Sequence, residues 1–522
     1  MRTDLASTPG AMARGAAVNL LGAVAAFALA FLFRLVVTHV VSVDDFGRLS
    51  IALTIVTLAQ VPALLGLDTG AIRFVALGAA AGDERAARGS VQVALGVVAL
   101  ASAAIAVVLA WQAPWLASHL FHGGGAAGSE AGRGEVASLL RLVAASLPGL
   151  ALARVAIGAI QGFGVMRYGA WLGSLRVVLN LATALPLLAL GFGVRGLGVA
   201  ALVTALATCG VALACLARVH PRAFVPAPDA WRLGRMLRFS APQTLTATLL
   251  QAILWTDTLL LARYGSAGDV GVYAIIGGVL QPATFVATAV GQMFAPRIVA
   301  EDARGDRPAL ARMLKRVTYW NTATSVPLYA TLILLPAPIL ALFGSAYERG
   351  AAALVILALG QFVNTAAGPL GQVINMSGRP YVSLLDNAFV ATVNLAIGLV
   401  LVPRYGLVGA ACSTAVALAL VNGIKLVQVR HIFGMHPFRR DTLRALAAAV
   451  GATAVAAPIA FVPPWPAAFP QVAAAGAALV LAYGVLVSAL GLDEEDRALF
   501  WSGRQRLARY LPLGRRAVRP SR

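Results

Sequence analysis

Charged residues are scarce in this chain, and lysine is almost missing. Only 12% of the 522 residues are charged, whereas a soluble domain carries about 25%. Lysine occurs only twice, the three cysteines fall inside apolar stretches without zinc spacing, and no Gly-x-x-x-x-Gly-Lys-[Ser/Thr] loop is present. The composition therefore excludes a soluble globular fold, and the motifs give no support to ATP hydrolysis or metal chemistry.

Apolar residues dominate instead, and they are arranged in long stretches. Hydrophobic residues make up 59% of the chain, and the mean hydropathy is +0.82. A helix that spans a membrane needs about 20 apolar residues. By this rule the sequence predicts fourteen spans, at roughly 16–40, 49–72, 90–111, 136–160, 169–191, 196–217, 240–262, 271–294, 318–343, 351–374, 381–402, 407–428, 442–463 and 468–491.

The first six spans are repeated in the next six. Two loops match at an offset of 224, and two amide positions match at an offset of 214. These matches are 45–50 with 269–274, 71–76 with 295–300, Gln161 with Asn375, and Asn180 with Asn394. We therefore expect an all-α integral membrane protein with about 14 transmembrane helices, built as two parallel-related six-helix bundles plus two C-terminal helices. Such duplicated bundles are the usual frame of a secondary transporter.

The repeat and the loops between spans divide the chain into five predicted parts. A bundle, a cytoplasmic linker, a second bundle, helices 13 and 14, and a cytoplasmic tail follow one another. Their predicted bounds are 1–217, 218–239, 240–430, 431–492 and 493–522.

The net charge of +20 is explained by topology. When the loops are assigned to alternate sides, 30 Lys and Arg residues outside the spans fall on one side and 6 on the other. This asymmetry follows the positive-inside rule and predicts that both termini are cytoplasmic. The expected location is the bacterial cytoplasmic (inner) membrane. Basic residues at a membrane surface attract anionic headgroups, so the charge does not indicate nucleic-acid binding.

Charged and amide side chains within apolar spans are the best candidates for a functional site. Arg34 follows small residues at steps of four, so it lies on the face that packs into the bundle. Arg154 shares a face with Gln161, and Arg176 shares one with Asn180. Arginine forks match phosphate geometry, and amides bond to sugar hydroxyls. These five residues are the predicted substrate-binding set, in a hydrated space for an anionic, hydroxyl-rich molecule.

A structural interpretation of the same residues stays open. At the offset of 224, Asp257 falls beside the position of Arg34, so these two residues could form an ion pair that clamps the halves. Arg154 and Arg176 could extend to the cytoplasmic interface instead of lining a cavity. Asp386 has no obvious cation near it in the sequence, and the cavity wall expected from the second half has few charges.

Several short motifs, in their order, resemble a known family. These are Val43–Leu49 after the arginine-bearing first span, Gly66–Phe74, Phe239–Pro242 before Asp257, Gly268–Tyr273 and Tyr405–Ala411. The pattern is similar to the bacterial polysaccharide-transporter family, the repeat-unit or O-antigen flippases of the multidrug/oligosaccharidyl-lipid/polysaccharide superfamily.

The resemblance implies a V-shaped bundle that works by alternating access. It would move undecaprenyl-diphosphate-linked oligosaccharide from the cytoplasmic to the periplasmic leaflet, for O-antigen, capsule or exopolysaccharide assembly. Arg34, Arg154 and Arg176 would line a cationic cavity, and Asp257 would couple transport to a proton or sodium ion. Expected partners are membrane lipids and the polysaccharide polymerase and export machinery. No cofactor, metal, catalytic residue or nucleic acid is expected.

Two transporter alternatives and one enzyme class remain at this stage. A peptidoglycan-precursor (lipid II) flippase would share the fourteen spans and the cationic cavity. A multidrug/cation antiporter of the same superfamily would favour an acidic cavity, against which the arginines argue. A membrane polymerase or ligase would carry a large external loop, and this chain has none longer than about 25 residues by the span rule.

Overall fold

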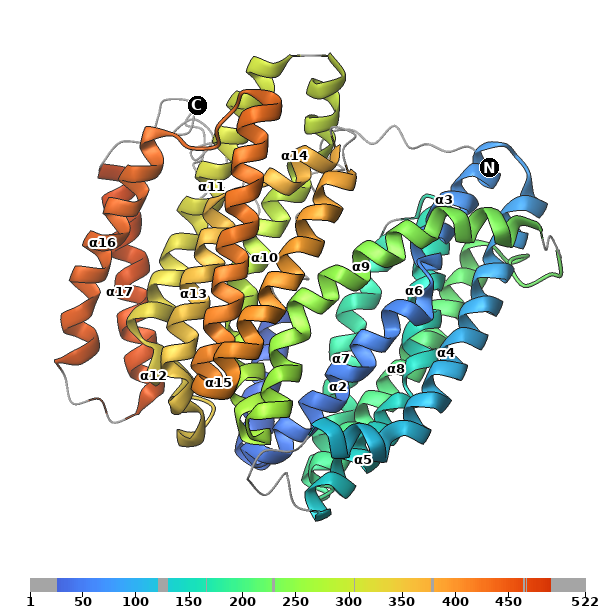
Figure 1. Ribbon diagram of the computed structural model, residues 1–522, viewed down its shortest axis with the longest axis horizontal. Helices are drawn as coiled ribbons and strands as arrows, with labels where there is room; N and C mark the ends of the chain where they lie inside the picture. The colour runs from blue at the N-terminus through green and yellow to red at the C-terminus, as the bar shows by residue number, and fades with distance from the viewer. Residues whose placement is uncertain are drawn as a thin grey trace, which may run out of the picture.

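The chain folds almost entirely into helices. The computed structural model describes residues 26–120, 130–165, 167–227, 231–304, 306–376, 380–462, 465 and 467–489, and all regular structure within these ranges is helical (Figure 1). The start of the first predicted span and the predicted tail at 493–522 lie outside them.

Each predicted span coincides with one helix or with consecutive helices. In the first half these are Ala26–Val40 (the first helix), α2 (Val43–Leu64), α3 (Leu67–Ala80), α4 (Glu84–Leu120), α5 (Glu130–Ala144), α6 (Leu147–Gly162), α7 (Arg167–Ala189) and α8 (Gly193–Val219). The second half contains α9 (Trp231–Tyr264), α10 (Ala267–Arg304), α11 (Arg307–Leu334), α12 (Pro336–Ala341), the 3-10 turn η1 (Ser345–Gly350), α13 (Ala351–Ala366), α14 (Leu370–Met376) and α15 (Pro380–Phe433). The last two helices are α16 (Arg440–Phe461) and α17 (Ala468–Ala489).

Among the described residues, nine helical stretches are long and apolar enough to cross a membrane. Some of them are interrupted. The second predicted span breaks at Leu65 and Gly66, which both have left-handed backbone angles (φ 49° and 65°). Gly66 has a packing reason as well, because a Cβ there would lie 2.7 Å from the carbonyl oxygen of Ser240 on α9. The 54-residue α15 holds two predicted spans joined by a kink at Gly406.

The internal repeat is visible in the backbone. Gly193, at the start of α8, and Gly406, in the kink of α15, share the same left-handed φ of 52°. Three residues later, Gly196 and Gly409 each pack against the preceding helix, at Leu187 and at Leu401 respectively. The two sites are 213 residues apart, which agrees with the repeat found in the sequence to within one residue.

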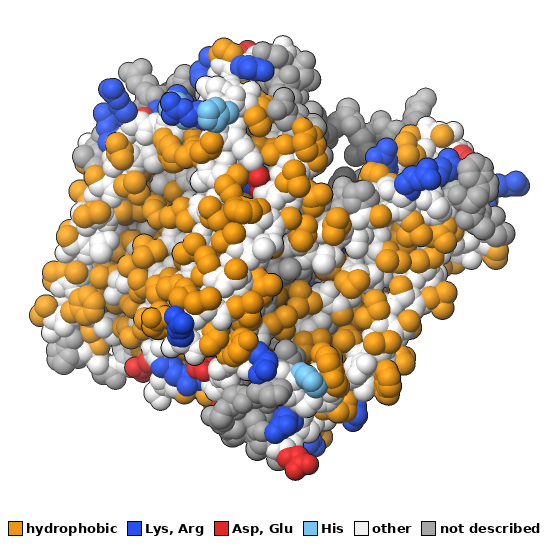
Figure 2. All heavy atoms as spheres, viewed as in Figure 1, with side chains coloured by type: hydrophobic (Ala, Val, Ile, Leu, Met, Phe, Trp, Pro, Cys, Tyr) orange, Lys and Arg blue, Asp and Glu red, His pale blue; other side chains and the backbone are white. Residues whose placement is uncertain are grey.

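The two halves form separate bundles that touch at one end (Figure 1). Helices α2–α8 lie on one side, and α10–α17 lie on the other. The bundles diverge toward the end that contains α3 and α14, and the space-filling view in Figure 2 shows a notch between them there. Helix α9 leans across from one bundle to the other. Its start lies at Trp231, so the last part of the predicted linker is helical.

At the closed end, equivalent residues of the two halves meet. A Cβ on Gly47 of α2 would lie 3.0 Å from the amide nitrogen of Gly271 on α10, and a Cβ on Gly271 would lie 3.2 Å from the amide nitrogen of Gly47. These glycines are 224 residues apart, the offset of the repeat. Any side chain larger than hydrogen would separate α2 from α10, so this backbone contact requires glycine on both sides.

Both helices in this contact begin with the same cap. The hydroxyl of Ser42 donates to Asp45 (2.8 Å) and accepts from the Asp45 amide (3.1 Å). The hydroxyl of Ser266 bonds to Asp269 with the same geometry, at 2.8 and 3.1 Å. Such reciprocal caps satisfy donors that the first turn of a helix leaves open, so each half has a well-defined first turn beside the shared glycine contact.

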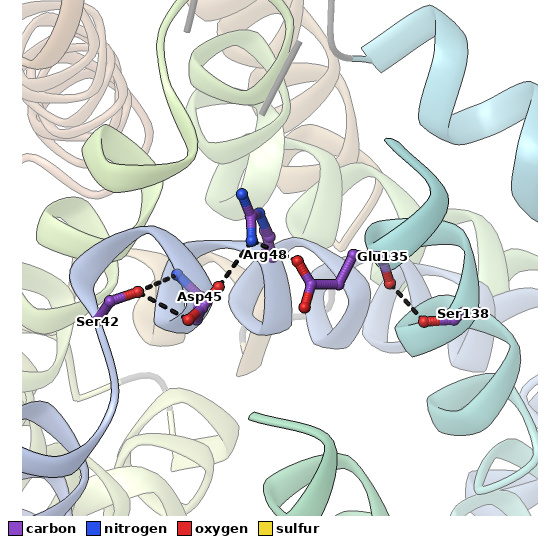
Figure 3. Close-up of polar contacts among 5 residues, drawn as sticks. All are labelled: Ser42, Asp45, Arg48, Glu135 and Ser138. Atoms are coloured by element: carbon purple, nitrogen blue, oxygen red, sulfur yellow. Dashed lines mark hydrogen bonds and ion pairs between the residues drawn. The ribbon is translucent and has the colours of Figure 1, made fainter. Parts of the chain in front are cut away.

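Each cap aspartate also pairs with an arginine, but the arginine comes from a different place in each half. In the first half Arg48 on α2 bridges Asp45 (2.7 Å) and Glu135 on α5 (2.5 Å), as Figure 3 shows. In the second half Arg349 of η1 lies 3.4 Å from Asp269. Glu135 and Arg349 are 214 residues apart. The ion pairs therefore stabilise each half internally.

At the diverging end, α9 stays attached to the first bundle. The ring of Phe239 meets Phe74 edge-on at 6.1 Å, and the guanidinium of Arg73 lies 4.3 Å from the centre of the Phe239 ring. On α4, Gln92 binds the backbone carbonyls of the linker residues Ala223 and Val225. The motifs Gly66–Phe74 and Phe239–Pro242, which carry part of the family resemblance, thus pack against each other.

The glycine contact gives the first testable prediction. Gly271→Val should force α10 away from α2 and lower the free energy of unfolding by about 1–3 kcal/mol, the usual cost of overpacking. The matched control is Gly277→Val on the same helix, where a Cβ would meet nothing within 4 Å. Melting temperatures of the purified variants in detergent would measure the difference. Equal melting temperatures would show that the contact is not restrictive.

Candidate functional site

Two of the predicted arginines come together in the first half. Arg154 on α6 and Arg176 on α7 are close enough for their charges to repel each other. Arg154 Nε lies 3.8 Å from Asp68 Oδ2, and the Arg154 side chain is 60% exposed. Arg176 is also exposed and forms no ion pair with any described residue. Of the two guanidinium groups only that of Arg154 has a carboxylate partner among the described residues, which leaves a local excess of positive charge.

Close helix packing holds Arg154 in this place. A Cβ on Gly158 would collide with the carbonyl oxygen of Asp68, and a Cβ on Gly162 would lie 2.8 Å from the Cβ of Val75 on the same helix, α3. The glycine face of α6 therefore lies directly on α3, and Arg154, one turn before Gly158, lies beside the first turn of α3. Asp68 Oδ1 accepts the neighbouring backbone amide at 2.8 Å, so Oδ2 is the oxygen that faces Arg154.

The predicted amides lie on the same two helices. The Nε2 atom of Gln161 lies 2.8 Å from the position that a Cβ on Gly169 would occupy, so its amide packs against the first turns of α7. Asn180 is half-buried one turn after Arg176. Four of the five predicted substrate residues are therefore on α6 and α7. Their contact with a substrate stays a prediction.

Arg34 lies apart from these residues, at the boundary between the halves. Its guanidinium lies against Gly278 on α10, where a Cβ would lie 2.5 Å from Arg34 Cζ. The first helix packs on the second half through Phe27 with Phe285 and through Phe31 with Phe343, with ring centres 4.7 and 5.4 Å apart. Arg34 thus belongs to the first helix but lies on the surface of the second bundle.

Asp257 is enclosed by hydroxyl groups within the second half. It is 2% exposed. Its Oδ2 accepts from the Tyr273 hydroxyl on α10 (2.9 Å) and from Thr414 on α15 in a short hydrogen bond, and its Oδ1 accepts from Ser413 (3.3 Å). Asn394 on α15 completes the shell. Within the described chain Asp257 therefore has hydroxyl and amide partners, and the Arg34–Asp257 ion pair considered from the sequence does not form.

The second half also contains a charged pair that sequence reasoning missed. Lys425, in the second limb of α15, is attracted by Asp386 in the first limb, and Gln428 donates to Asp386 Oδ1 at 2.7 Å. The expectation that Asp386 has no cation nearby was wrong. Lys425 is the single lysine in any predicted span, and an antiparallel arrangement of neighbouring spans would have placed it opposite Asp386.

Comparison with known proteins now identifies the family. The family model described as polysaccharide biosynthesis protein matches residues 12–300, which is more than half of the chain. The chain belongs to this family. A second model, MatE, matches residues 242–400. A search of curated protein sequences gives no match.

Solved structures of low sequence identity share the fold. The lipid II flippase MurJ in an inward closed conformation aligns with a TM-score of 0.73 at 14% identity, over 90% of this chain and 98% of its own. An inward-facing multidrug resistance MATE family transporter of the MOP superfamily aligns at 0.61 and 16%, over 77% and 94%. A mutant of the Vibrio cholerae MATE transporter VcmN aligns at 0.58 and 17%, over 81% and 98%. The predicted fold class, an all-helical multi-pass membrane transporter, is confirmed.

The hydroxyl shell of Asp257 generates a stability prediction. Asp257→Ala would remove the carboxylate that accepts from the Tyr273 and Thr414 hydroxyls, whereas Ser413 would keep the Ala410 carbonyl, and an unsatisfied buried group costs about 1–3 kcal/mol. Asp257→Asn keeps one acceptor oxygen and the shape, so it should lose clearly less. Thermal unfolding in detergent would rank wild type, Asn and Ala in that order. If Ala melts no lower than Asn, the hydroxyl shell does not depend on the carboxylate.

Proposed function

We propose that this protein flips undecaprenyl-diphosphate-linked oligosaccharide repeat units from the cytoplasmic to the periplasmic leaflet, for O-antigen, capsule or exopolysaccharide assembly. Membership of the polysaccharide biosynthesis family supports the general class. The observation that supports this substrate is the Arg154–Arg176 pair. Within the described chain, Asp68 is the one carboxylate that balances part of its positive charge. An uncompensated cationic pair in an apolar bundle indicates an anionic ligand.

A diphosphate suits this pair. Each guanidinium can bind phosphate oxygens through two parallel N–H donors, and these charge-assisted bonds are among the strongest in proteins. The diphosphate must cross about 30 Å of hydrocarbon, where an unpaired charge is costly. Arginines that pair with phosphate lower this barrier, and the nearby amides of Gln161 and Asn180 can bond sugar hydroxyls. The lipid tail remains in the bilayer throughout.

Alternating access would use the contact between the halves. The bundles meet at Gly47 and Gly271 and diverge at the other end. By the positive-inside rule the diverging end faces the cytoplasm, so this conformation would admit substrate from the cytoplasmic leaflet. Separation at the glycine contact, with closure at α3 and α14, would expose the same site to the periplasm.

Asp257 would couple this movement to an ion gradient. It is a buried carboxylate surrounded by oxygen-bearing side chains, a suitable environment for a proton or a sodium ion. The sequence has no nucleotide-binding loop, and we place the protein in the bacterial inner membrane as a non-enzymatic transporter. Its expected partners are the polysaccharide polymerase and export machinery.

Complementation separates the candidate substrates. The gene should restore surface polysaccharide to a strain that lacks its repeat-unit flippase. It should not rescue growth when lipid II flippase is depleted, nor raise resistance to cationic drugs. Rescue of lipid II transport alone would favour the peptidoglycan alternative, and drug resistance alone would favour the antiporter.

The arginine pair gives a quantitative prediction in the same assay. Arg154→Ala and Arg176→Ala should each reduce surface polysaccharide by on the order of tenfold or more, the effect of losing one charge-assisted phosphate contact of about 1.5–3 kcal/mol. Lysine at either position should restore part of it. Arg195→Ala, an exposed arginine at the start of α8, is the control. Normal export by both alanine variants at normal protein levels would contradict the proposal.

Orientation is tested independently of substrate. A reporter enzyme that is active only in the cytoplasm should function when inserted in the 221–227 loop, which follows α8. The same enzyme inserted after Val41 should be inactive, because the turn between the first helix and α2 is predicted to be periplasmic. The opposite pattern would reverse the predicted topology.

A further inference from the structure

Three groups of polar side chains lie along the two limbs of α15 inside the second half, with further members from α9, α10 and α13. The first surrounds Asp257. In the second, Asn422 donates to Asn364 Oδ1 (2.9 Å), and Asn364 donates to Gln361 (3.4 Å). The third is the group of Asp386, Lys425 and Gln428. We call these three groups together the polar ladder.

The polar ladder extends through most of the membrane thickness. Along the second limb of α15 its levels are marked by Thr414, Asn422 and Gln428. At about 1.5 Å of rise per residue, the distance from Thr414 to Gln428 is roughly 21 Å, compared with about 30 Å of hydrocarbon. It ends two residues before the exposed Arg430. Polar groups at three separate levels thus lie between Asp257 and the basic end of the molecule.

The Asp386 end of the ladder has hydrogen-bonding capacity that the described residues do not use. Asp386 is 7% exposed, and its Oδ2 has no partner among them. The same holds for Gln428 Oε1 and for the hydroxyl of Ser383, one turn before Asp386. Buried polar atoms are normally bonded, and where protein supplies no partner, ordered water does. These oxygen atoms can therefore bind water or a cation.

The fold itself does not require these residues. At the offset of 214, Asn364, Asp386 and Gln428 correspond to Leu150, Leu172 and Ala214 in the first half. The two halves share helix order, caps and breaks, yet the first half fills these positions with apolar side chains. Polar groups are expensive in a membrane interior. Their presence in one half alone indicates a role that this half performs.

We infer that the polar ladder is a hydrated path by which a small monovalent cation moves between Asp257 and the cytoplasmic side. This inference rests on the proposed role of Asp257 in ion coupling. The pair of Asp386 and Lys425 forms the mouth of the path. Asp386 compensates the charge of Lys425, so a cation entering there is not repelled.

Cysteine accessibility tests the path without any substrate. Asn364→Cys and Asn422→Cys are made in a variant in which Cys209, Cys215 and Cys412 are replaced by alanine. The probe is methanethiosulfonate ethylammonium, a water-soluble cation, applied to inside-out membrane vesicles. Val326→Cys on α11, at 4% exposure and packed in an apolar cluster with Ala452 and Leu479, is the dry control, and Arg430→Cys is the exposed one.

The ladder cysteines should react on the order of tenfold faster than Val326→Cys, because thiol modification requires a thiolate in contact with water. Reaction rates equal to that of Val326→Cys would overturn the inference. Because the assay requires no transport, failure of the flipping assay leaves this result unaffected, and a dry ladder would not by itself exclude flipping.

The charge of the mouth gives a second measurement. Asp386→Asn leaves Lys425 uncompensated, so it should slow the cationic reagent at Asn422→Cys several-fold while changing the rate of neutral N-ethylmaleimide little. Adding Lys425→Met to the Asp386→Asn variant should restore the rate at which the cationic reagent modifies Asn422→Cys. Equal slowing of both reagents would show that Asp386 acts only on packing and would contradict its place at the mouth.

Discussion

The backbone contact between Gly47 and Gly271 is the constraint on which the arrangement of the two halves depends. It joins equivalent positions of a duplicated chain, so each half presents the same surface to the other. The salt bridges beside it do not cross this contact, because Arg48 and Arg349 bind carboxylates of their own half. Separation of the halves there would leave these two arginines with their carboxylate partners.

In each half an arginine pairs with the aspartate that caps the helix at the contact, but the two arginines come from different elements. The cap aspartate is paired by Arg48, from α2 itself, in the first half and by Arg349, from the turn before α13, in the second. Their interiors then diverge further. The first half has excess cations on α6 and α7, and the second has a carboxylate within a hydroxyl shell and a neutral charged pair. A duplicated frame thus holds excess positive charge in one half and a buried carboxylate in the other.

The sequence predicted the helices and the repeat well, because span length and the offsets at 224 and 214 depend on local composition. It placed Arg154 and Gln161 on one helix, which the structure shows as α6. It could not predict the approach of Lys425 to Asp386, which requires the packing of two antiparallel limbs. Nor could it predict the break at Leu65, a non-glycine residue with a left-handed angle beside Gly66, which lies against α9. Such contacts are tertiary and leave little trace in local sequence.

The candidate ion site and the contact between the halves share a single helical turn. Tyr273, which donates to Asp257, lies two residues after Gly271 on α10. A change in the charge or occupancy of Asp257 changes the force on Tyr273, and this force acts on the same turn that rests on Gly47. Arg154 and Arg176 lie in the other half, without a direct bond to Asp257. In the proposed mechanism, communication between the anionic substrate and the cation passes through the relative position of the two bundles, and the first turns of α10 are one connection between them.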